Sequence, residues 1–238
     1  MTHKRQQEKT EAAREARRGR RARSKTLWMS VIAGLAALVI GIVWFAAAPS
    51  GGAAGRAEAA LIQISEDDWI EGNPKAGATL VEYSDFQCPA CGAYFPLLKK
   101  LSAEFGGRLR IVYRHFPLEF HPYSGLAAQA AEAAGKQGRF WEMHDLIFRQ
   151  QQEWSTRVGG ARPLFLGYAR EIGLDPARFE ADLDSNEVRQ AVEADRRSGI
   201  RLGLNSTPTF FLNGVKIQNP RGYNSFKERI EKAIADAS

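Results

Sequence analysis

Residues 79–91 read TLVEYSDFQCPAC, an apolar run that ends in two cysteines three positions apart. The run from Thr79 to Phe86 has the length and composition of a β-strand. From Cys88 to about Phe105 the apolar residues recur every three or four positions, as they do on one face of a helix. The cysteine pair is therefore predicted to lie where a strand ends and a helix begins.

Cys88 and Cys91 are the only cysteines in the 238-residue chain. Two cysteines so close in sequence cannot link distant parts of a fold, so their chemistry must be local. A helix N-terminus, with its unpaired N–H groups and partial positive charge, stabilises a thiolate at Cys88 and lowers its pKa. Pro89 suits the first helical position, and Ala90 adds neither charge nor bulk. We expect Cys88 to exchange with substrate thiols and Cys91 to resolve the mixed disulfide, with no cofactor other than this redox-active disulfide.

Glu82, Thr207 and Pro208 complete the predicted catalytic site. A carboxylate in a central parallel strand is unusual, because such strands are buried on both faces. Burial would raise the pKa of Glu82 and let it handle the proton of Cys91, whereas a glutamate exposed at a strand end is the alternative. A proline that opens a strand cannot donate to the sheet, and X–Pro bonds can be cis. A cis bond here would turn the Thr207 backbone toward a ligand or a sulfur, and an ordinary loop proline is the alternative.

The remaining elements follow in an order that indicates the fold. A second strand is expected at 109–116, and five helical segments follow it, at about 123–136, 139–151, 163–172, 176–183 and 187–202. Strands at 209–212 and 215–217 flank Asn213-Gly214, which favours a type I′ hairpin because both turn residues need positive φ. A last amphipathic helix is expected at 225–235. A βαβ unit and a ββα unit, separated by an all-helical insertion at about 122–203, predict an α/β thioredoxin fold.

The positive charge of the chain lies in one tail. Residues 1–26 hold ten Lys or Arg against three Glu, a net of +7, whereas residues 27–238 have a net charge of −1. A nucleic-acid-binding protein would need its basic residues on a folded face. The charge distribution therefore argues against a nucleic-acid partner, and residues 1–26 are interpreted as a basic cytoplasmic tail.

Residues 27–48 form a stretch of 22 residues without a charge. A helix of this length covers about 33 Å, enough to cross the hydrocarbon core of about 30 Å. The sequence thus predicts a single anchor in the cell membrane, with the N-terminus in the cytoplasm and the catalytic domain on the extracytoplasmic, or periplasmic, side. Residues 49–60 are expected to be a flexible linker to a folded domain at 61–238. A cleaved signal peptide is the alternative, although its apolar region normally has only ~7–15 residues.

Four separated stretches resemble the DsbA-type branch of the thioredoxin superfamily: VEYSDFQCPAC at 81–91, YRHFPL at 113–118, QGRFWEMH at 137–144 and STPTFF at 206–211. The resemblance implies a cis Thr207–Pro208 bond with substrate docking there. It also implies oxidation of exported cysteine-containing polypeptides and re-oxidation by a quinone-linked membrane partner. Ala90 departs from the histidine of the best-known site of this family, which removes one stabiliser of the thiolate.

Other functions remain compatible with the same residues. A membrane-tethered disulfide reductase or isomerase would use the same two cysteines. Such relatives also have a threonine before the cis-proline, at the position of Thr207. A non-catalytic binder of unfolded exported polypeptides would not need the cysteines at all. A zinc site would need two further ligands at regular spacing, and neither His115 nor His121 forms a matching pair with another histidine. These two histidines are interpreted as structural, and no metal site is predicted.

Overall fold

A computed structural model describes residues 34, 38 and 62–237 of the chain. The chain divides into two units, Met1–Gly52 and Ala53–Ser238. In the first unit only Gly34 and Leu38 are described, and both are helical. The predicted tail and linker, and all of the predicted anchor apart from these two residues, lie outside the described residues. Within the described part of the chain, no helix has the length and apolar character needed to cross a membrane.

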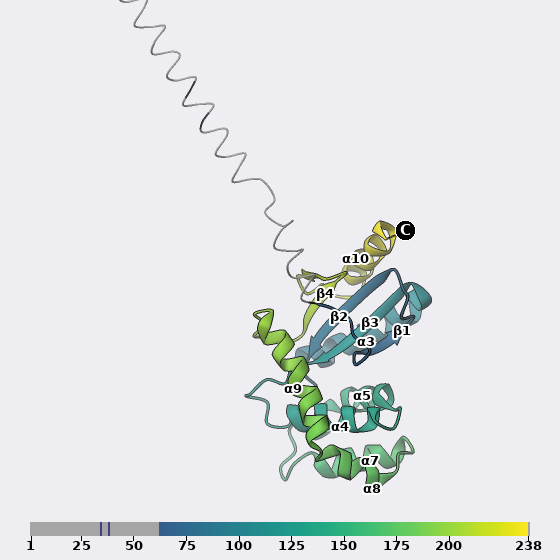
Figure 1. Ribbon diagram of the computed structural model, residues 1–238, viewed down its shortest axis with the longest axis vertical. Helices are drawn as coiled ribbons and strands as arrows, with labels where there is room; N and C mark the ends of the chain where they lie inside the picture. Colours follow the sequence, from purple (N-terminus) through teal and green to yellow (C-terminus); the bar gives the residue numbers. More distant parts are fainter. Residues whose placement is uncertain (1–33, 35–37, 39–61, 238) are drawn as a thin grey trace, which may run out of the picture. The chain divides into compact units, whose positions relative to one another are not determined.

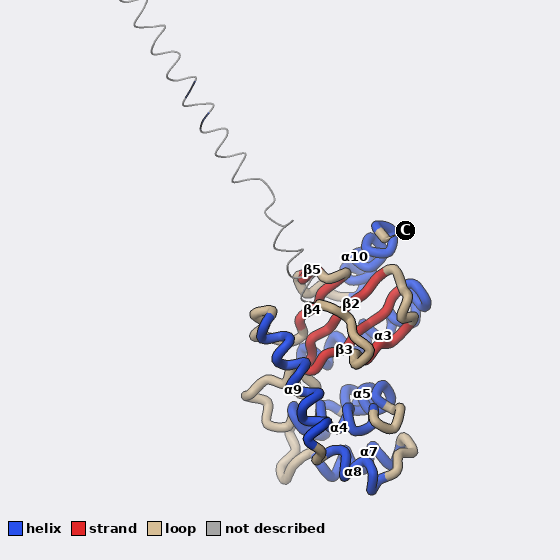
Figure 2. Tube along the Cα trace, in the orientation of Figure 1, coloured by secondary structure: helices blue, strands red, loops and turns tan. Residues whose placement is uncertain are grey.

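The second unit is built on one mixed five-stranded sheet with the order β1-β3-β2-β4-β5 (Figures 1 and 2). The strands are β1 (Trp69–Gly72), β2 (Ala78–Ser84), β3 (Leu109–His115), β4 (Thr209–Leu212) and β5 (Val215–Ile217). β2 lies at the centre, parallel to β3 and antiparallel to β4. This arrangement is the predicted thioredoxin-like α/β fold, and it places the C-terminal end of β2 inside the sheet.

Helices cover both faces of the sheet. α3 (Pro89–Phe105) and α10 (Tyr223–Asp236) share an apolar core with Leu80, Ile111 and Phe210. On the other face, α9 (Asn186–Arg201) approaches so closely that a Cβ on its Gly199 would lie 2.6 Å from the Phe116 ring. A glycine is therefore needed where α9 crosses the sheet. A short 3₁₀ helix, Gly106–Arg108, joins α3 to β3.

The predicted all-helical insertion lies between β3 and β4. It contains α4 (Ser124–Gly135), α5 (Phe140–Arg149), α6 (Gln151–Ser155), α7 (Arg162–Glu171), α8 (Pro176–Leu183) and α9. In Figure 1 the helices α4, α5, α7 and α8 form a block at one end of the sheet, and α9 leads back from this block toward the strands. Buried side chains of α4, α5 and α7 belong to one core that also contains both cysteines.

Two features differ from the elements expected from the sequence. Strand β1 was not predicted; it pairs antiparallel with β3 in the register Trp69↔Tyr113. The single helix expected at 139–151 is two helices, because Gln150 leaves the helical conformation at φ −101° and ψ 16°. The hairpin is as predicted, since Asn213 and Gly214 both have positive φ, at 49° and 81°.

Candidate active site

Cys88 occupies the junction between β2 and α3. It is the N-cap residue of α3, with an extended backbone conformation, and Pro89 is the first residue inside the helix. Both cysteines are free thiols; Cys88 is 7% exposed and Cys91, one turn further along α3, is fully buried. Pro89 and Ala90 between them are exposed. The pair is therefore unequal in access, with Cys88 the more accessible sulfur.

The surroundings of Cys88 stabilise its thiolate and lower its pKa from 9.0 to about 5. The largest cause is a hydrogen bond from the Cys91 thiol. The Thr207 side chain and the backbone N–H groups of Cys91 and Ala90 also lower the pKa of Cys88, whereas burial raises it. The backbone donors are the free N–H groups of a helix N-terminus, which suit an anion. At neutral pH the Cys88 sulfur is therefore mostly ionised.

Cys91 has the opposite environment. Burial is the main cause that raises its pKa well above 9.0, and the neighbouring Cys88 and Glu82 raise it further. The backbone N–H of Asp85 donates to its sulfur at 3.5 Å. Cys91 is therefore held as a thiol while Cys88 is a thiolate.

Glu82 lies on the central strand between Tyr113 of β3 and Phe210 of β4. It is 2% exposed, so the alternative of an exposed strand-end glutamate does not apply. Burial is the first cause that raises its pKa from 4.5 to about 8, although the Ser84 hydroxyl donates to its Oε1 at 2.8 Å. Glu82 also interacts electrostatically with Cys91, so its carboxyl group, with a pKa of about 8, is a candidate for proton exchange with that thiol.

The loop before β4 brings Thr207 and Pro208 to the same place. The Thr207–Pro208 peptide bond is cis, as the family resemblance implies. The Cys88 thiol donates to the Thr207 carbonyl oxygen at 3.5 Å. The Thr207 hydroxyl is buried without a partner next to the thiol, so it is available to donate once Cys88 ionises. Residues 119 positions apart in sequence thus meet at one sulfur.

Asp85 and His121 belong to the site's framework, a place that the sequence pattern does not predict for them. The buried Asp85 carboxylate accepts from the backbone N–H groups of Gln87 and Leu118, at 2.7 and 2.9 Å. Its Oδ2 also lies 2.7 Å from His121 Nδ1. His115 lies in a separate polar cluster, with Nε2 2.9 Å from a carboxylate oxygen of Glu132. Each of the two histidines thus has a carboxylate partner, and His121 supports the turn that carries Cys88.

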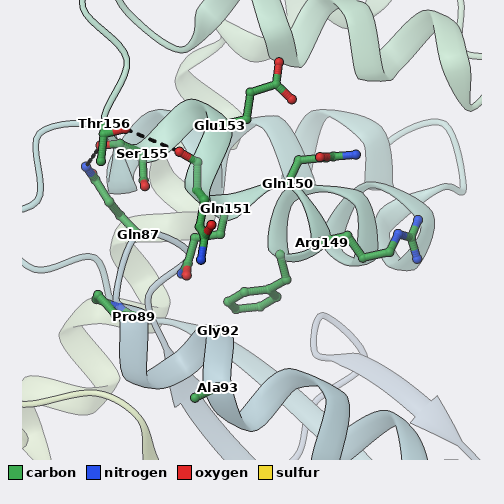
Figure 3. A pocket seen from close by; sticks show the side chains of 12 residues that line it. Gln87, Pro89, Gly92, Ala93, Arg149, Gln150, Gln151, Glu153, Ser155 and Thr156 are labelled. Atoms are coloured by element: carbon green, nitrogen blue, oxygen red, sulfur yellow. Dashed lines mark hydrogen bonds between the residues drawn. The ribbon is translucent and has the colours of Figure 1, made fainter.

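A groove with a volume of about 960 Å³ runs beside the first turn of α3 (Figure 3). Pro89, Gly92 and Ala93 line one side, and residues 148–153 line the other. The groove connects the active-site helix with the junction of α5 and α6, and half of its lining residues have amide or hydroxyl side chains. Among residues 62–237, no group of three His, Cys, Asp or Glu side chains is placed to hold a metal ion.

Comparison with known proteins assigns the fold to a family. A family profile described as "Thioredoxin" matches residues 65–232. Among solved structures, BdbD from Bacillus subtilis superposes with a TM-score of 0.63 at 26% identity, covering 71% of this chain and 94% of that one. A thioredoxin-like oxidoreductase from Silicibacter pomeroyi gives 0.60 at 26% identity, with 71% and 93% covered. Alpha-DsbA1 from Wolbachia pipientis gives 0.67 at 21% identity, with 76% and 97% covered, which shows likeness of fold.

Curated relatives with higher identity have a different name. The chain is 41% identical over 173 residues to Na⁺/H⁺ antiporter NhaA of Herminiimonas arsenicoxydans, covering 73% of this chain and 26% of that protein. It is 38% identical over 188 residues to Na⁺/H⁺ antiporter NhaA 1 of Salinispora arenicola, covering 74% and 26%. The chain thus spans about a quarter of the length of these relatives.

Proposed function

Because the chain belongs to the thioredoxin family, whose profile matches residues 65–232, we propose that it is a thiol–disulfide oxidoreductase with its redox centre at Cys88-Pro89-Ala90-Cys91. The observation that carries the proposal is the inequality of the two sulfurs. The accessible Cys88 is a thiolate with a pKa of about 5, and the buried Cys91 beside it is a thiol with a raised pKa. Such a pair can accept two electrons and return them through Cys88, the more accessible of the two sulfurs.

The proposed direction is oxidation of substrate dithiols. A substrate thiolate attacks Cys88 of the Cys88–Cys91 disulfide; an S–S bond forms between substrate and Cys88, and Cys91 leaves with the electron pair and takes up a proton. A second substrate thiolate then attacks the substrate sulfur of the mixed disulfide, and Cys88 leaves as a thiolate. The substrate has lost two electrons and the enzyme has gained them. The stabilised Cys88 thiolate is a good leaving group, which favours this direction.

Glu82 has a proposed role in the first of these steps. Its pKa of about 8 keeps its carboxyl group protonated for much of the time at neutral pH. It can therefore give a proton to the Cys91 sulfur as that sulfur leaves the disulfide, and take one up when Cys91 is oxidised again. Glu82 acts here as a general acid–base group, and Cys88 needs no such help because it leaves as an anion.

The cellular setting is also a proposal. The uncharged stretch at 27–48, after a basic tail, supports a domain tethered to the cell membrane and exposed on the extracytoplasmic side. There the substrates would be exported cysteine-containing polypeptides, and a quinone-linked membrane protein would re-oxidise the cysteines. The disulfide would serve as the only redox cofactor.

The equilibrium with glutathione tests the proposed direction. The reduction potential of thioredoxin is about −270 mV. An oxidase should have a reduction potential well above this value, because its reduced form is stabilised. A value near that of thioredoxin would favour a reductase or isomerase that uses the same cysteines. Full biological activity of a Cys88→Ser variant would instead favour a non-catalytic binder of unfolded polypeptides.

The similarity to antiporters supports a second proposal about the substrate. A domain so close to part of a membrane transport protein could act on cysteines of such a protein. In a Cys91→Ala variant the Cys88 thiolate can attack a substrate disulfide and displace one substrate sulfur as a thiolate. Because Cys91 is not present to displace the other substrate sulfur, the substrate stays attached to Cys88 as a mixed disulfide. Recovery of a membrane transporter in these mixed disulfides would support this second proposal, and recovery of exported polypeptides alone would contradict it.

A further inference from the structure

Two glutamine side chains cross between the active-site turn and the helical insertion. Gln87, which precedes Cys88, reaches the insertion: its Nε2 donates to the Ser155 carbonyl at 2.8 Å, and its Oε1 accepts from the Tyr123 backbone N–H at 2.7 Å. Gln151, the first residue of α6, reaches in the opposite direction. Its Nε2 donates to the carbonyl oxygens of Phe86 and Cys88, at 2.7 and 2.9 Å. Figure 3 shows Gln151 directed toward the start of α3.

The first turn of α3 is shaped to receive this amide. A Cβ at Gly92 would lie 2.3 Å from Gln151 Oε1 and 2.9 Å from its Cδ, far inside van der Waals contact. Gly92 therefore leaves space for the Gln151 amide between the helix and the groove. Both N–H bonds of the amide nitrogen are used, one for each carbonyl on either side of Gln87.

The carbonyls of Phe86 and Cys88 belong to the backbone segment that orients the N-terminus of α3 toward the Cys88 sulfur. The Cys88 carbonyl also accepts from the Gly92 backbone N–H at 3.1 Å, so it is the first acceptor of the α3 ladder. The N–H groups of Ala90 and Cys91, which come after Pro89, point toward the Cys88 sulfur and stabilise its anion. A change in the orientation of the Phe86–Cys88 backbone would turn these donors away, because hydrogen bonds weaken steeply with angle.

We infer that Gln151 is a positioning residue for the Cys88 thiolate, since its amide clamps the carbonyls of Phe86 and Cys88 and so fixes the backbone donors that face the sulfur. The inference rests on the proposed function and deepens it, because it gives the helical insertion a part in the redox chemistry. Gln151 does not touch the reacting sulfur. It acts through the backbone of the turn.

The test replaces Gln151 by Met, which has similar length and volume but no N–H donor. We expect the acid dissociation constant of Cys88 to fall about threefold to tenfold, as measured by thiolate absorbance against pH. The equilibrium constant with glutathione should shift toward the disulfide form by a similar factor, because the reduced form has lost the same stabilisation. Gln152→Met is the matched control, since this exposed neighbour lines the same groove and reaches neither carbonyl; it should leave both constants within twofold of the wild type.

A second variant keeps the test decisive if Gln151→Met folds poorly. Gly92→Ala retains Gln151 but forces its amide out of place, so it should shift both constants in the same direction. In a Gln151→Ala background the added methyl group has nothing to displace, and Gly92→Ala should then have no further effect. Values within twofold of the wild type in both Gln151→Met and Gly92→Ala would overturn the inference, whatever the melting temperature does. A wild-type Cys88 that titrates near 9 would overturn the proposed function instead.

Discussion

The pKa of Cys88 depends most on its neighbour three residues away. The largest single cause of the low value, about 5, is the hydrogen bond from the Cys91 thiol. We therefore expect Cys88 in a Cys91→Ala variant to titrate above 5, yet still below 9.0 because Thr207 and the backbone donors remain. Cys91→Ser, which retains a hydroxyl donor, should give an intermediate value. Thiolate absorbance measured against pH checks the order of the three proteins, and a Cys91→Ala midpoint at or below the wild-type value would contradict it.

Glu82 makes stability depend on pH in the opposite sense from an ordinary carboxylate. Its pKa rises from 4.5 to about 8 on folding, mainly through burial, so between these values the folded protein binds more protons than the unfolded one. The free energy of unfolding should therefore fall as pH rises through this window, by at most about 1.4 kcal/mol per pH unit. Glu82→Gln stays neutral and should gain stability over the wild type across the same window.

Urea unfolding of the disulfide form at several pH values measures this difference. The disulfide form is used because Cys88 does not titrate in it. An exposed glutamate of the same domain provides the control, since Glu66→Gln should follow the wild-type profile. Parallel profiles for the wild type and Glu82→Gln would show that the Glu82 carboxyl is not perturbed by burial.

The turn between β2 and α3 is an element whose shape depends on one buried carboxylate. Asp85 accepts from the backbone at Gln87 and Leu118 and pairs with His121, so it joins the end of β2 to the loop after β3. Asp85→Ala removes the acceptor of one buried and one part-buried N–H group, and we expect a loss of about 2–4 kcal/mol in the free energy of unfolding. Chemical denaturation measures this loss. Asp67→Ala at an exposed position should change stability little, and an Asp85→Ala protein as stable as Asp67→Ala would refute the role given to this carboxylate.

The secondary structure elements show which features of the fold can be predicted from local sequence. The hairpin at Asn213-Gly214 and the helices of the insertion follow from turn chemistry and apolar spacing, and both are present. Strand β1 has only four residues, and its pairing with β3 depends on contacts about 40 positions away, for which a local pattern carries no signal. The break at Gln150 is likewise invisible, because no Gly or Pro marks it.

The residues of the candidate site also include some that local sequence predicts and some that it does not. Cys88, Cys91, Glu82, Thr207 and Pro208 could be chosen from residue type and position, and the structure places all five together. Gln87, Asp85 and Gln151 could not, because glutamine and aspartate have many surface roles and their partners in other elements lie 33 to 68 positions away. A signal for Gln151 exists only in combination with Gly92, whose missing side chain makes room for it.

At the scale of the whole domain, the tryptophan at the start of β1 joins the sheet to the insertion. The Trp69 ring stacks on Phe140 of α5 with centroids 4.3 Å apart, its Nε1 donates to Glu132 of α4 at 2.7 Å, and it fills the space above Gly135. Trp69→Phe keeps much of the packing and loses the donor, so it should cost about 1–3 kcal/mol, while Trp69→Ala should cost about 3–5 kcal/mol. Urea denaturation ranks the two variants. Equal stability of Trp69→Ala and the wild type would show that this contact does not hold the two parts together.

The direction of electron flow should be visible in the stability of the whole domain. In the reduced protein the Cys88 pKa falls from 9.0 to about 5 on folding, so between these values the folded state binds fewer protons than the unfolded state. The stability of the reduced form relative to the disulfide form should therefore rise with pH through this window, and this advantage should be lost as pH drops toward 5. The disulfide form has no titrating Cys88. Glu82 titrates in both forms, so its contribution largely cancels from the difference in stability between them. At pH 7 the lowered pKa of Cys88 should add roughly 1–3 kcal/mol to the free energy of unfolding of the reduced form, relative to the disulfide form.

A thermodynamic cycle links this difference to function. If the folded domain is more stable reduced than oxidised, its disulfide is reduced more readily than the same two cysteines in the unfolded chain, as a disulfide donor requires. Urea unfolding of both forms at several pH values, with Cys88→Ser as a variant without the thiolate, measures the difference directly. A reduced form that is less stable than the oxidised one at pH 7, with a gap that does not change with pH, would mean that folding favours the disulfide, and electrons would then flow from the domain to its substrates.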